Sequence, residues 1–320
     1  MSAWRSFVAA SLLFTGCAMA QDWPTKPIRV VIPSAPGGLG DVVMRTIAPT
    51  VEAKLGQRFL VEAKPGAGGD IGATEVARSA PDGHTVMLAP TAVYGVLPHM
   101  QKNVHYDPIK DFAPVTMVVD APVLILVNSG LPVRSLKELV AYTRANPGKL
   151  NVGSAGIGTP AHILGEYYSK LYGAVVSITY VGAPQVSLAL QANEVQVLFA
   201  TLAGVRAQLA AGSVRLIAVQ ARERLAEHPD VPTAFEQGFP ELGDFSSGWG
   251  MVAPRGTDPR IVERLWSEIR NAVSDPGVKK RFADAGQIAV ASSPAEFGQF
   301  IRAELERWKK VADQAGIKPQ

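Results

Sequence analysis

The stretch IRVVIPSAPGGLGD, residues 28–41, joins a short apolar run to a loop with paired glycines and then to an acidic residue. An apolar β-strand that leads through a short loop into a helix is the repeating unit of parallel α/β sheets. In such sheets, ligands bind beyond the carboxyl ends of the strands, where the loops enter the helices. The stretch therefore predicts an α/β fold and also predicts where in that fold a ligand would bind.

The same alternation continues on both sides of a long apolar run at residues 113–128. Three units of strand followed by helix or turn precede the run, and a second series of strands and helices follows it. The expected helices cover residues 41–55, 70–79, 135–146, 160–171, 184–192, 259–273 and 294–315. N-caps for the last two are available at Thr257-Asp258 and Ser292-Ser293. These two series predict mainly parallel sheets flanked by helices.

Three glycine-rich loops lie between a predicted strand and a predicted helix: PGGLGD at residues 36–41, PGAGGDIG at 65–72 and GSAGIGTP at 153–160. Glycine lets the backbone approach a ligand closely, and the free N–H groups at a helix start favour an anion. Any one of these loops could be only a tight turn. Together they predict a cleft that is lined by backbone donors and holds a small anionic molecule.

Motifs for catalysis, metals and cofactors are weak. Residues 66–72 spell G-x-G-x-x-x-G, close to the dinucleotide fingerprint, but Pro65 precedes the first glycine and no acid ends an obvious next strand. Ser154 does not stand in a G-x-S-x-G elbow, and the five histidines show no paired spacing for a metal. Asp41 and Asp70 stand alone at predicted helix starts, where capping explains them as well as ligand contact does. The sequence predicts no catalytic residue, no metal site and no cofactor.

Residues 1–20 have the features of a secretory signal peptide, with Arg5, an apolar stretch, and Ala-Met-Ala directly before Gln21. We expect cleavage after Ala20 and a soluble mature protein. Cleavage also removes Cys17, the single cysteine, unless that residue is a lipid-attachment site, for which the preceding residues are a poor match. Without Arg5 the mature chain has 30 Lys and Arg against 28 Asp and Glu. This balance, with no basic cluster, predicts no nucleic-acid partner.

Longer segments resemble one known family. They are WPTKPIR (23–29), VEAKPGAGGDIGA (61–73), SAPDGHTVML (79–88), LNVGSAGIGTPAHILGE (150–166), AAGSVRLIAV (210–219), HPDVPTAFEQG (228–238), GWGMVAPRGTD (248–258) and ERWKKVADQAGIK (306–318). In order and spacing, over essentially the whole mature chain, they look like the substrate-binding proteins of tripartite tricarboxylate transporters, also called the Bug family.

The resemblance implies a receptor in the periplasm with the two-lobed, type II-like periplasmic binding protein fold, in which two crossing strands join the lobes. Lobe 1 would take residues 21–122 and 250–320, and lobe 2 would take residues 123–249, with crossings near 118–127 and 248–253. The resemblance also implies a small carboxylate ligand, delivery to integral-membrane permease subunits and no enzymatic activity. We expect a monomer.

Carried to matching positions, the family's ligand contacts fall at strand ends in both lobes. In lobe 1 they are Ser34, Ala35, Gly37, Gly38, Asp41, Gly68, Gly69, Asp70 and Thr91, and in lobe 2 they are Ser154, Gly156, Gly158, Thr159 and Tyr180. Donors on both lobes imply that the ligand bridges them, so closure depends on the ligand.

Three positions depart from the family's pattern: Ala63, Val181 in place of a lysine, and Gln196 in place of an aspartate. Two fewer charges near the binding face favour a ligand less polar than citrate, such as an aromatic or aliphatic mono- or dicarboxylate. Neutral drift at solvent-facing positions is an equal alternative. The sequence does not separate delivery to a permease from signalling to a sensor kinase. An exported carboxylate-processing enzyme would need a reactive dyad that the sequence does not offer.

Overall fold

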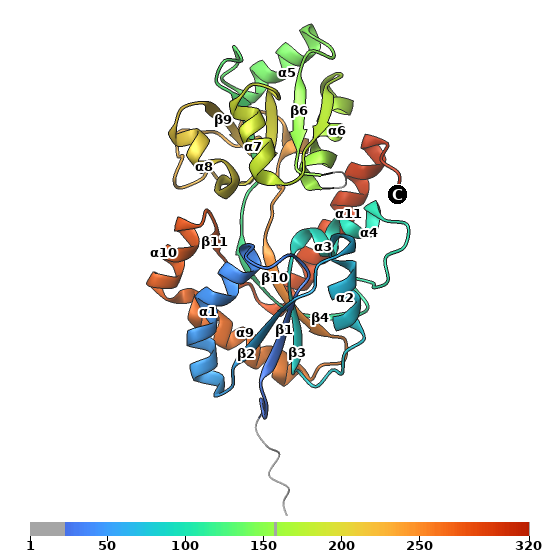
Figure 1. Cartoon of the computed structure of the whole chain (residues 1–320), viewed down its shortest axis with the longest axis vertical. Helices are drawn as coiled ribbons and strands as arrows, with labels where there is room; N and C mark the ends of the chain where they lie inside the picture. The colour runs from blue at the N-terminus through green and yellow to red at the C-terminus, as the bar shows by residue number, and fades with distance from the viewer. Residues whose placement is uncertain (1–22, 157–158, 320) are drawn as a thin grey trace, which may run out of the picture.

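The computed structural model describes residues 23–156 and 159–319, so the expected signal peptide lies outside the described residues. Figure 1 shows two lobes stacked along the long axis, each built around one sheet. The sheet of lobe 1 has the order β11-β4-β10-β3-β1-β2, and its strands are β1 (Ile28–Ile32), β2 (Phe59–Ala63), β3 (Thr85–Pro90), β4 (Phe112–Asp120), β10 (Trp249–Pro254) and β11 (Ile288–Ala289). The sheet of lobe 2 has the order β7-β6-β8-β5-β9, and its strands are β5 (Leu124–Asn128), β6 (Asn151–Ser154), β7 (Val176–Thr179), β8 (Val197–Ala200) and β9 (Val214–Val219). The predicted two-lobed α/β class is confirmed, with β5, β10 and β11 antiparallel to their neighbours.

Helices cover both faces of each sheet. In lobe 1, one face carries α1 (Leu39–Leu55), α9 (Pro259–Ser274) and α10 (Pro276–Asp284), and the other carries η1 (Ala67–Gly69), α2 (Asp70–Ala77), α3 (Thr91–Gly95) and α4 (Leu97–Met100). In lobe 2, α5 (Leu136–Ala145) and α6 (Pro160–Tyr172) cover one face, and α7 (Ala183–Gln191) and α8 (Leu202–Ala210) cover the other. Because side chains alternate along a strand, Val30 packs on the α1 side and Val31 on the α2 side. The apolar run that begins at Ile28 is therefore buried from both sides.

The apolar run at residues 113–128 divides into two strands that belong to different sheets. The break lies at residues 121–123, between β4 in lobe 1 and β5 in lobe 2. The return crossing at residues 245–248 pairs with it, since the N–H of Val123 donates to the carbonyl of Phe245 at 2.9 Å and the N–H of Ser247 donates to the carbonyl of Ala121 at 2.8 Å. This crossing lies just before β10, whereas the sequence placed it near 248–253, within that strand.

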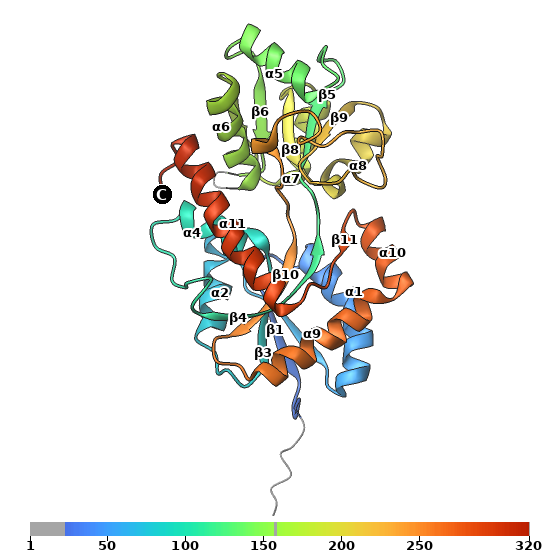
Figure 2. The ribbon, with the colours of Figure 1, turned by 180° about the vertical axis from the view of Figure 1, so that it is seen from behind.

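The last helix, α11 (Pro294–Ala315), contributes to both lobes. Its N-terminal half packs Phe297 and Ile301 into lobe 1, and its C-terminal half packs Trp308 and Val311 into the core of lobe 2. Figure 2 shows the helix running from lobe 1 to a position beside α6. The sequence assignment of the whole C-terminal region to lobe 1 does not describe this second half. Two crossing segments and one helix therefore connect the lobes.

Capping explains where the C-terminal helices begin. Asp258 caps α9, and Ser293 forms a capping box with Glu296 at the start of α11, as the sequence predicted. The sequence analysis missed α10. Its signal was Asp275 before a proline, because the Asp275 carboxylate accepts hydrogen bonds from two N–H groups of the first turn of α10.

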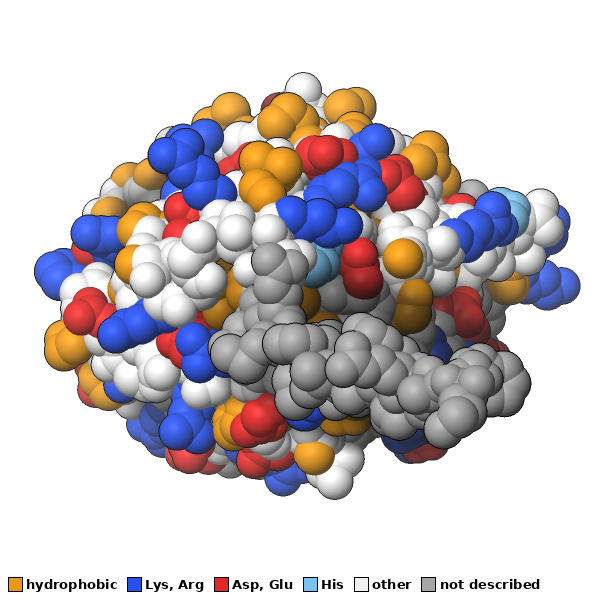
Figure 3. Space-filling model, turned by 90° about the horizontal axis from the view of Figure 1, so that it is seen from below, with side chains coloured by type: hydrophobic (Ala, Val, Ile, Leu, Met, Phe, Trp, Pro, Cys, Tyr) orange, Lys and Arg blue, Asp and Glu red, His pale blue; other side chains and the backbone are white. Residues whose placement is uncertain are grey.

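Charged side chains are mixed on the lower face of lobe 1. Figure 3 shows Lys and Arg there, interspersed with Asp and Glu. The charges visible in this view are therefore mixed in sign. Within residues 23–156 and 159–319, no helix is long and apolar enough to cross a membrane.

Candidate ligand-binding site

The loops that follow the parallel strands of the two lobes face each other. Figure 1 shows the starts of α1 and α3 at the upper end of lobe 1, and the start of α6 at the lower end of lobe 2. These helices follow β1, β3 and β6. The facing ends are therefore the carboxyl ends of strands, where ligands bind in open α/β sheets.

The first loop leaves one side-chain oxygen without a partner. The Oγ of Ser34 is buried and makes no hydrogen bond within the described structure. Ala35, Gly37 and Gly38 are exposed, so their backbone groups are accessible. The carboxylate of Asp41, in contrast, accepts a hydrogen bond from the N–H of Gly37. Asp41 therefore closes the loop that precedes α1, but it does not cap the helix, because the N-cap is Gly38 and makes no side-chain hydrogen bond.

The glycines of the second loop allow close packing as well as an unusual backbone. Gly68 and Gly69 have φ angles of 65° and 115°, which side chains rarely adopt. A Cβ would lie 2.9 Å from a methyl group of Leu97 at Gly68, and 2.8 Å from a methyl group of Val93 at Gly69. Packing against α3 and α4 is thus sufficient to explain both glycines.

Asp70 and Thr91 connect the loops of lobe 1 to other segments. Asp70 is 5% exposed, and its carboxylate accepts from the N–H of His105 at 2.8 Å and lies 2.7 Å from the ring Nδ1 of His105. This carboxylate is committed to holding the segment after α4. The N–H of Thr91 donates to the carbonyl of Gly248 at 2.9 Å, which ties the loop after β3 to the return crossing.

The third loop forms the start of α6. Thr159 caps the helix by accepting from the N–H of His162 at 3.4 Å, and its hydroxyl donates to the carbonyl of Gly156 at 2.7 Å. Ser154 is buried at the end of β6, with its Oγ 3.3 Å from the hydroxyl of Thr179. Gly158, the other predicted contact, lies outside the described residues.

A cavity of about 190 Å³ lies beside this loop, at the carboxyl ends of strands β6 and β8 of lobe 2. Three helix starts meet there, at Thr159 of α6, Ala183 of α7 and Thr201 of α8. The full lining is Val123, Ala155, Thr159, Pro160, Ala161, Leu164, Ala183, Val186, Ser187, Leu198, Phe199, Ala200, Thr201, Gly204 and Ser247, with no charged side chain among these residues. The sequence analysis missed Thr201, although it follows strand β8 as Thr91 follows β3.

The remaining predicted positions lie away from this cavity. The hydroxyl of Tyr180 donates to the Glu194 carboxylate at 3.2 Å on the exposed surface. Val181 is 88% exposed, and Ala63 ends β2 in lobe 1. Gln196 precedes β8 at its amino end, and its Oε1 accepts from the N–H of residue 151 at 2.9 Å. Gln196 therefore lies at the opposite end of β8 from the cavity, which favours neutral drift at this position.

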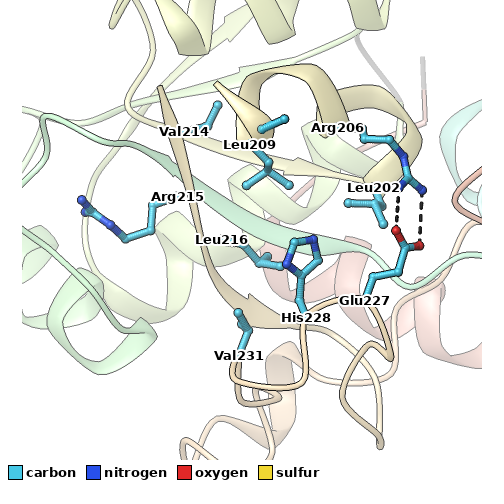
Figure 4. Close-up of a pocket in the computed structure, with 10 residues that line it drawn as sticks. Leu202, Arg206, Leu209, Val214, Arg215, Leu216, Glu227, His228 and Val231 are labelled. Atoms are coloured by element: carbon cyan, nitrogen blue, oxygen red, sulfur yellow. Dashed lines mark hydrogen bonds and ion pairs between the residues drawn. The ribbon is translucent and has the colours of Figure 1, made fainter. Parts of the chain in front are cut away.

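A larger hollow of about 460 Å³ lies elsewhere on lobe 2, between α8, β9 and residues 227–231. Figure 4 shows Arg206 paired with Glu227 at its edge, while the guanidinium of Arg215 points away. Arg215 donates to backbone carbonyls, one of them that of Val133 at 2.8 Å. Both guanidinium groups thus already have partners within the protein. None of the ligand contacts predicted from the sequence lines this hollow.

Among the described residues, no group of three or more His, Cys, Asp or Glu side chains is placed to hold a metal ion. His105 contacts Asp70, and the Nε2 of His99 lies 2.8 Å from the backbone carbonyl of Leu305. Both contacts hold segments of lobe 1 together.

Comparison with known proteins identifies a family. The family model described as the tripartite tricarboxylate transporter family receptor matches residues 43–317. Protein BugT of Bordetella pertussis is 33% identical over 302 residues, which is 93% of this chain and 92% of BugT. The structure of R. palustris Rpa4515 with adipate has a TM-score of 0.80 and 29% identity, covering 93% of this chain and 100% of that one. MatC from Rhodopseudomonas palustris with bound malate has a TM-score of 0.75 and 31% identity, covering 90% and 99%.

Proposed function

The chain belongs to the tripartite tricarboxylate transporter family of receptors, and from this membership we propose that it is a periplasmic receptor for a small carboxylate. The ligand binds in the cleft between the two lobes. The loaded receptor, acting as a monomer, delivers the ligand unchanged to the integral-membrane permease subunits of such a transporter.

One observation carries this proposal: loops that begin helices follow the parallel strands of both lobes and face each other. A carboxylate needs hydrogen-bond donors, and N–H groups at helix starts supply them without a charged side chain. The solved relatives support the same ligand class, because Rpa4515 was solved with adipate and MatC with malate. Donors on both lobes also give a reason for closure, since only the closed state satisfies both ends of the ligand.

We assign the carboxylate contacts by availability. In lobe 1 they are the unpartnered Oγ of Ser34 and the exposed backbone of Ala35 and Gly38, because the N–H of Gly37 already donates to Asp41. In lobe 2 we assign Thr201 at the cavity, whose side chain makes no capping hydrogen bond, whereas the hydroxyl and N–H of Thr159 already donate to the carbonyl of Gly156. Asp41 and Asp70 are structural in this assignment, because their carboxylates already accept hydrogen bonds within lobe 1.

The wall of the cavity favours a ligand with an apolar body. Leu164, Val186 and Phe199 line it, and its lining residues carry no charge. Placing an additional ionised group against such a wall costs free energy unless it is paired. We therefore infer a mono- or dicarboxylate with an aliphatic or aromatic body in preference to citrate.

The first test is a thermal-shift screen of the purified mature protein with citrate, malate, adipate, benzoate, phthalate, terephthalate and amino acids. A ligand that binds only the folded state raises the melting temperature by mass action. We expect the largest shift from a mono- or dicarboxylate that can be recovered unchanged by mass spectrometry. A shift with citrate or amino acids alone would contradict the ligand class, and recovery of a chemically altered molecule would support the enzyme alternative.

Delivery is tested by uptake of the carboxylate that binds. Deleting the gene for this chain should abolish uptake while the permease genes are intact. Normal uptake, together with a lost transcriptional response to the same carboxylate, would support the sensor-kinase alternative instead.

A further inference from the structure

Three carboxylates meet where the lobes are joined. Asp120 is the last residue of β4, Asp244 directly precedes the return crossing, and Glu304 lies in the middle of α11. Each of the three connections between the lobes thus contributes one acid. We call Asp120, Asp244 and Glu304, with Arg222 and Arg307, the hinge cluster. Beside it lies a cavity of about 190 Å³ lined by Asp120, Pro122, Gln220, Ala221, Asp244, Phe245, Ser246, Phe300 and Arg307.

Glu304 is the most deeply buried acid of the hinge cluster, at 1% exposed. Its Oε2 accepts a hydrogen bond from the indole N–H of Trp308 at 2.9 Å. Its Oε1 lies 2.7 Å from a guanidinium nitrogen of Arg307 but makes no hydrogen bond. Arg307 is shared, because it also donates to the backbone carbonyl of Asp244 and lies 3.9 Å from the Asp244 carboxylate.

The hinge cluster contains one more acid than base. When Asp120, Asp244 and Glu304 are all ionised, they face only Arg307 and Arg222, and the side chain of Arg222 is 75% exposed and largely screened. The same cavity also contains a buried acceptor without a partner, because Gln220 is 0% exposed and its Oε1 accepts no hydrogen bond. A buried excess charge and an unpaired buried acceptor are both costly.

Protonation of one acid removes the excess. Burial raises the pKa of Glu304 to about 7, against the opposing effects of Arg307 and Trp308, and Asp120 and Asp244 raise it further. Burial also raises the pKa of Asp120, and Asp244 adds to the effect. The hinge cluster therefore changes charge close to neutral pH, with Glu304 as the group that binds the proton.

Other titratable groups packed on α11 make contacts of their own. From α4, the ring of His99 contacts the backbone carbonyl of Leu305. From α3, the buried phenol of Tyr94 donates to the carbonyl of Gly250 at 3.1 Å. From α6, Tyr167 has a pKa that burial and Glu241 raise above its ordinary value, so it stays neutral in this range.

We propose that the hinge cluster is a proton-linked switch, in which one proton held by Glu304 stabilises the arrangement of the two lobes seen in this structure. Loss of that proton leaves an unbalanced negative charge between the three connections. The repulsion is relieved when β4, the return crossing and α11 separate and water enters the cavity. The lobes are therefore held together more firmly in mildly acidic than in mildly alkaline surroundings.

The test uses the mature protein without any ligand, so its outcome is independent of the proposed function. The radius of gyration is measured by small-angle X-ray scattering at pH 5.5 and 8.5, and tryptophan fluorescence is titrated between them, since Trp308 donates directly to Glu304. We expect a larger radius at pH 8.5 and a fluorescence transition with its midpoint near neutral pH. An identical radius at both pH values in the wild-type protein overturns the proposal, whether or not the fluorescence changes.

Two variants test whether Glu304 causes the pH-dependent change in radius. Glu304→Gln keeps the shape of the side chain and, like the protonated acid, carries no charge at either pH, so we expect the smaller radius at both pH values and loss of the fluorescence transition. Glu306→Gln is the matched control, because Glu306 is exposed on the same helix, and it should behave as wild type. A pH-dependent radius that persists in a folded Glu304→Gln protein, as judged by circular dichroism, overturns the role of Glu304.

Discussion

Gly40, in the first turn of α1, lies so close to the indole ring of Trp249 that a Cβ at residue 40 would come within 2.5 Å of the ring. Gly40→Ala therefore overpacks the contact between α1 and the strand that returns from lobe 2. We expect a loss of about 1–3 kcal/mol in the free energy of unfolding, measured by urea denaturation. Gly204→Ala is the control, since nothing lies within 4 Å of a Cβ there. Equal stability of the two variants would contradict this explanation of Gly40.

A hydrogen bond between two helices joins the lobes at their outer edges. Arg206 of α8 donates to the backbone carbonyl of Ala283 in α10 at 3.3 Å, while it also pairs with Glu227. We expect Arg206→Ala to accelerate amide hydrogen exchange at residues 283–286. Global stability should change by less than about 1 kcal/mol because the pair is exposed. Arg224→Ala, which removes a pair within lobe 2, should leave exchange at those residues unchanged.

A substitution at Asp70 shows whether this residue has a structural role or contacts the ligand. Asp70→Ala leaves the N–H and the ring of His105 without their acceptor, so we expect a loss of about 1–3 kcal/mol in stability. The melting temperature should fall accordingly. Asp313→Ala, which removes an exposed pair with Lys309, is the control and should have little effect. An Asp70→Ala protein with wild-type stability but no carboxylate binding would restore Asp70 as a ligand contact.

A charge introduced at Thr201 tests whether the cavity of lobe 2 binds the carboxylate, and it should not disturb the fold. Aspartate is as good an N-cap as threonine, so Thr201→Asp should not lower stability. A negative charge at the cavity should weaken carboxylate binding at least about tenfold, since like charges in contact repel by more than about 1.4 kcal/mol. Isothermal titration with adipate, or with the carboxylate that binds best in the screen, measures the change. Ser135→Asp at the start of α5, at the far end of lobe 2 in Figure 1, is the matched control and should bind normally.

Stability should depend on pH through Glu304. Its pKa rises from 4.5 to about 7 on folding because of burial, so the folded state binds more protons than the unfolded state between these values. The contribution is complete below pH 4.5 and is lost as the pH rises through 7, with a total of about 3 kcal/mol. Urea unfolding at pH 5 and 8 should show a smaller decline for Glu304→Gln than for wild type. Parallel declines would show that Glu304 does not titrate on folding.

The sequence predicted the elements whose signals are local. The strand that begins at Ile28, the N-cap at Ser293 and the glycine loops at strand ends each depend on neighbouring residues, and their order predicted the α/β class. The two-lobed arrangement was implied by the family resemblance. The family resemblance supplied candidate contacts in both lobes. Local pattern could not decide whether those contacts face a ligand or the protein's own backbone.

Contacts between distant residues account for what the sequence missed. Asp70 was a candidate ligand contact because nothing nearby indicates that His105, 35 residues later, occupies its carboxylate. Gln196 was assigned to the binding face because its departure from the family was visible, but the end of β8 at which it lies was not. The hinge cluster combines residues from β4, the return crossing and α11, which only the folded chain brings together.

The position of β10 has a consequence for the order in which the protein folds. All strands of lobe 2 come from residues 124–219, so that sheet can assemble from one continuous stretch of chain. In lobe 1, β10 lies between β3 and β4, and Trp249 pairs with Pro90, far away in sequence. Pairings of such long range form late because a large loop must close first. We therefore expect the sheet of lobe 1 to be completed last. Strands β3 and β4 are joined through β10 only after the chain has passed through lobe 2, so the five-stranded sheet forms before the six-stranded one.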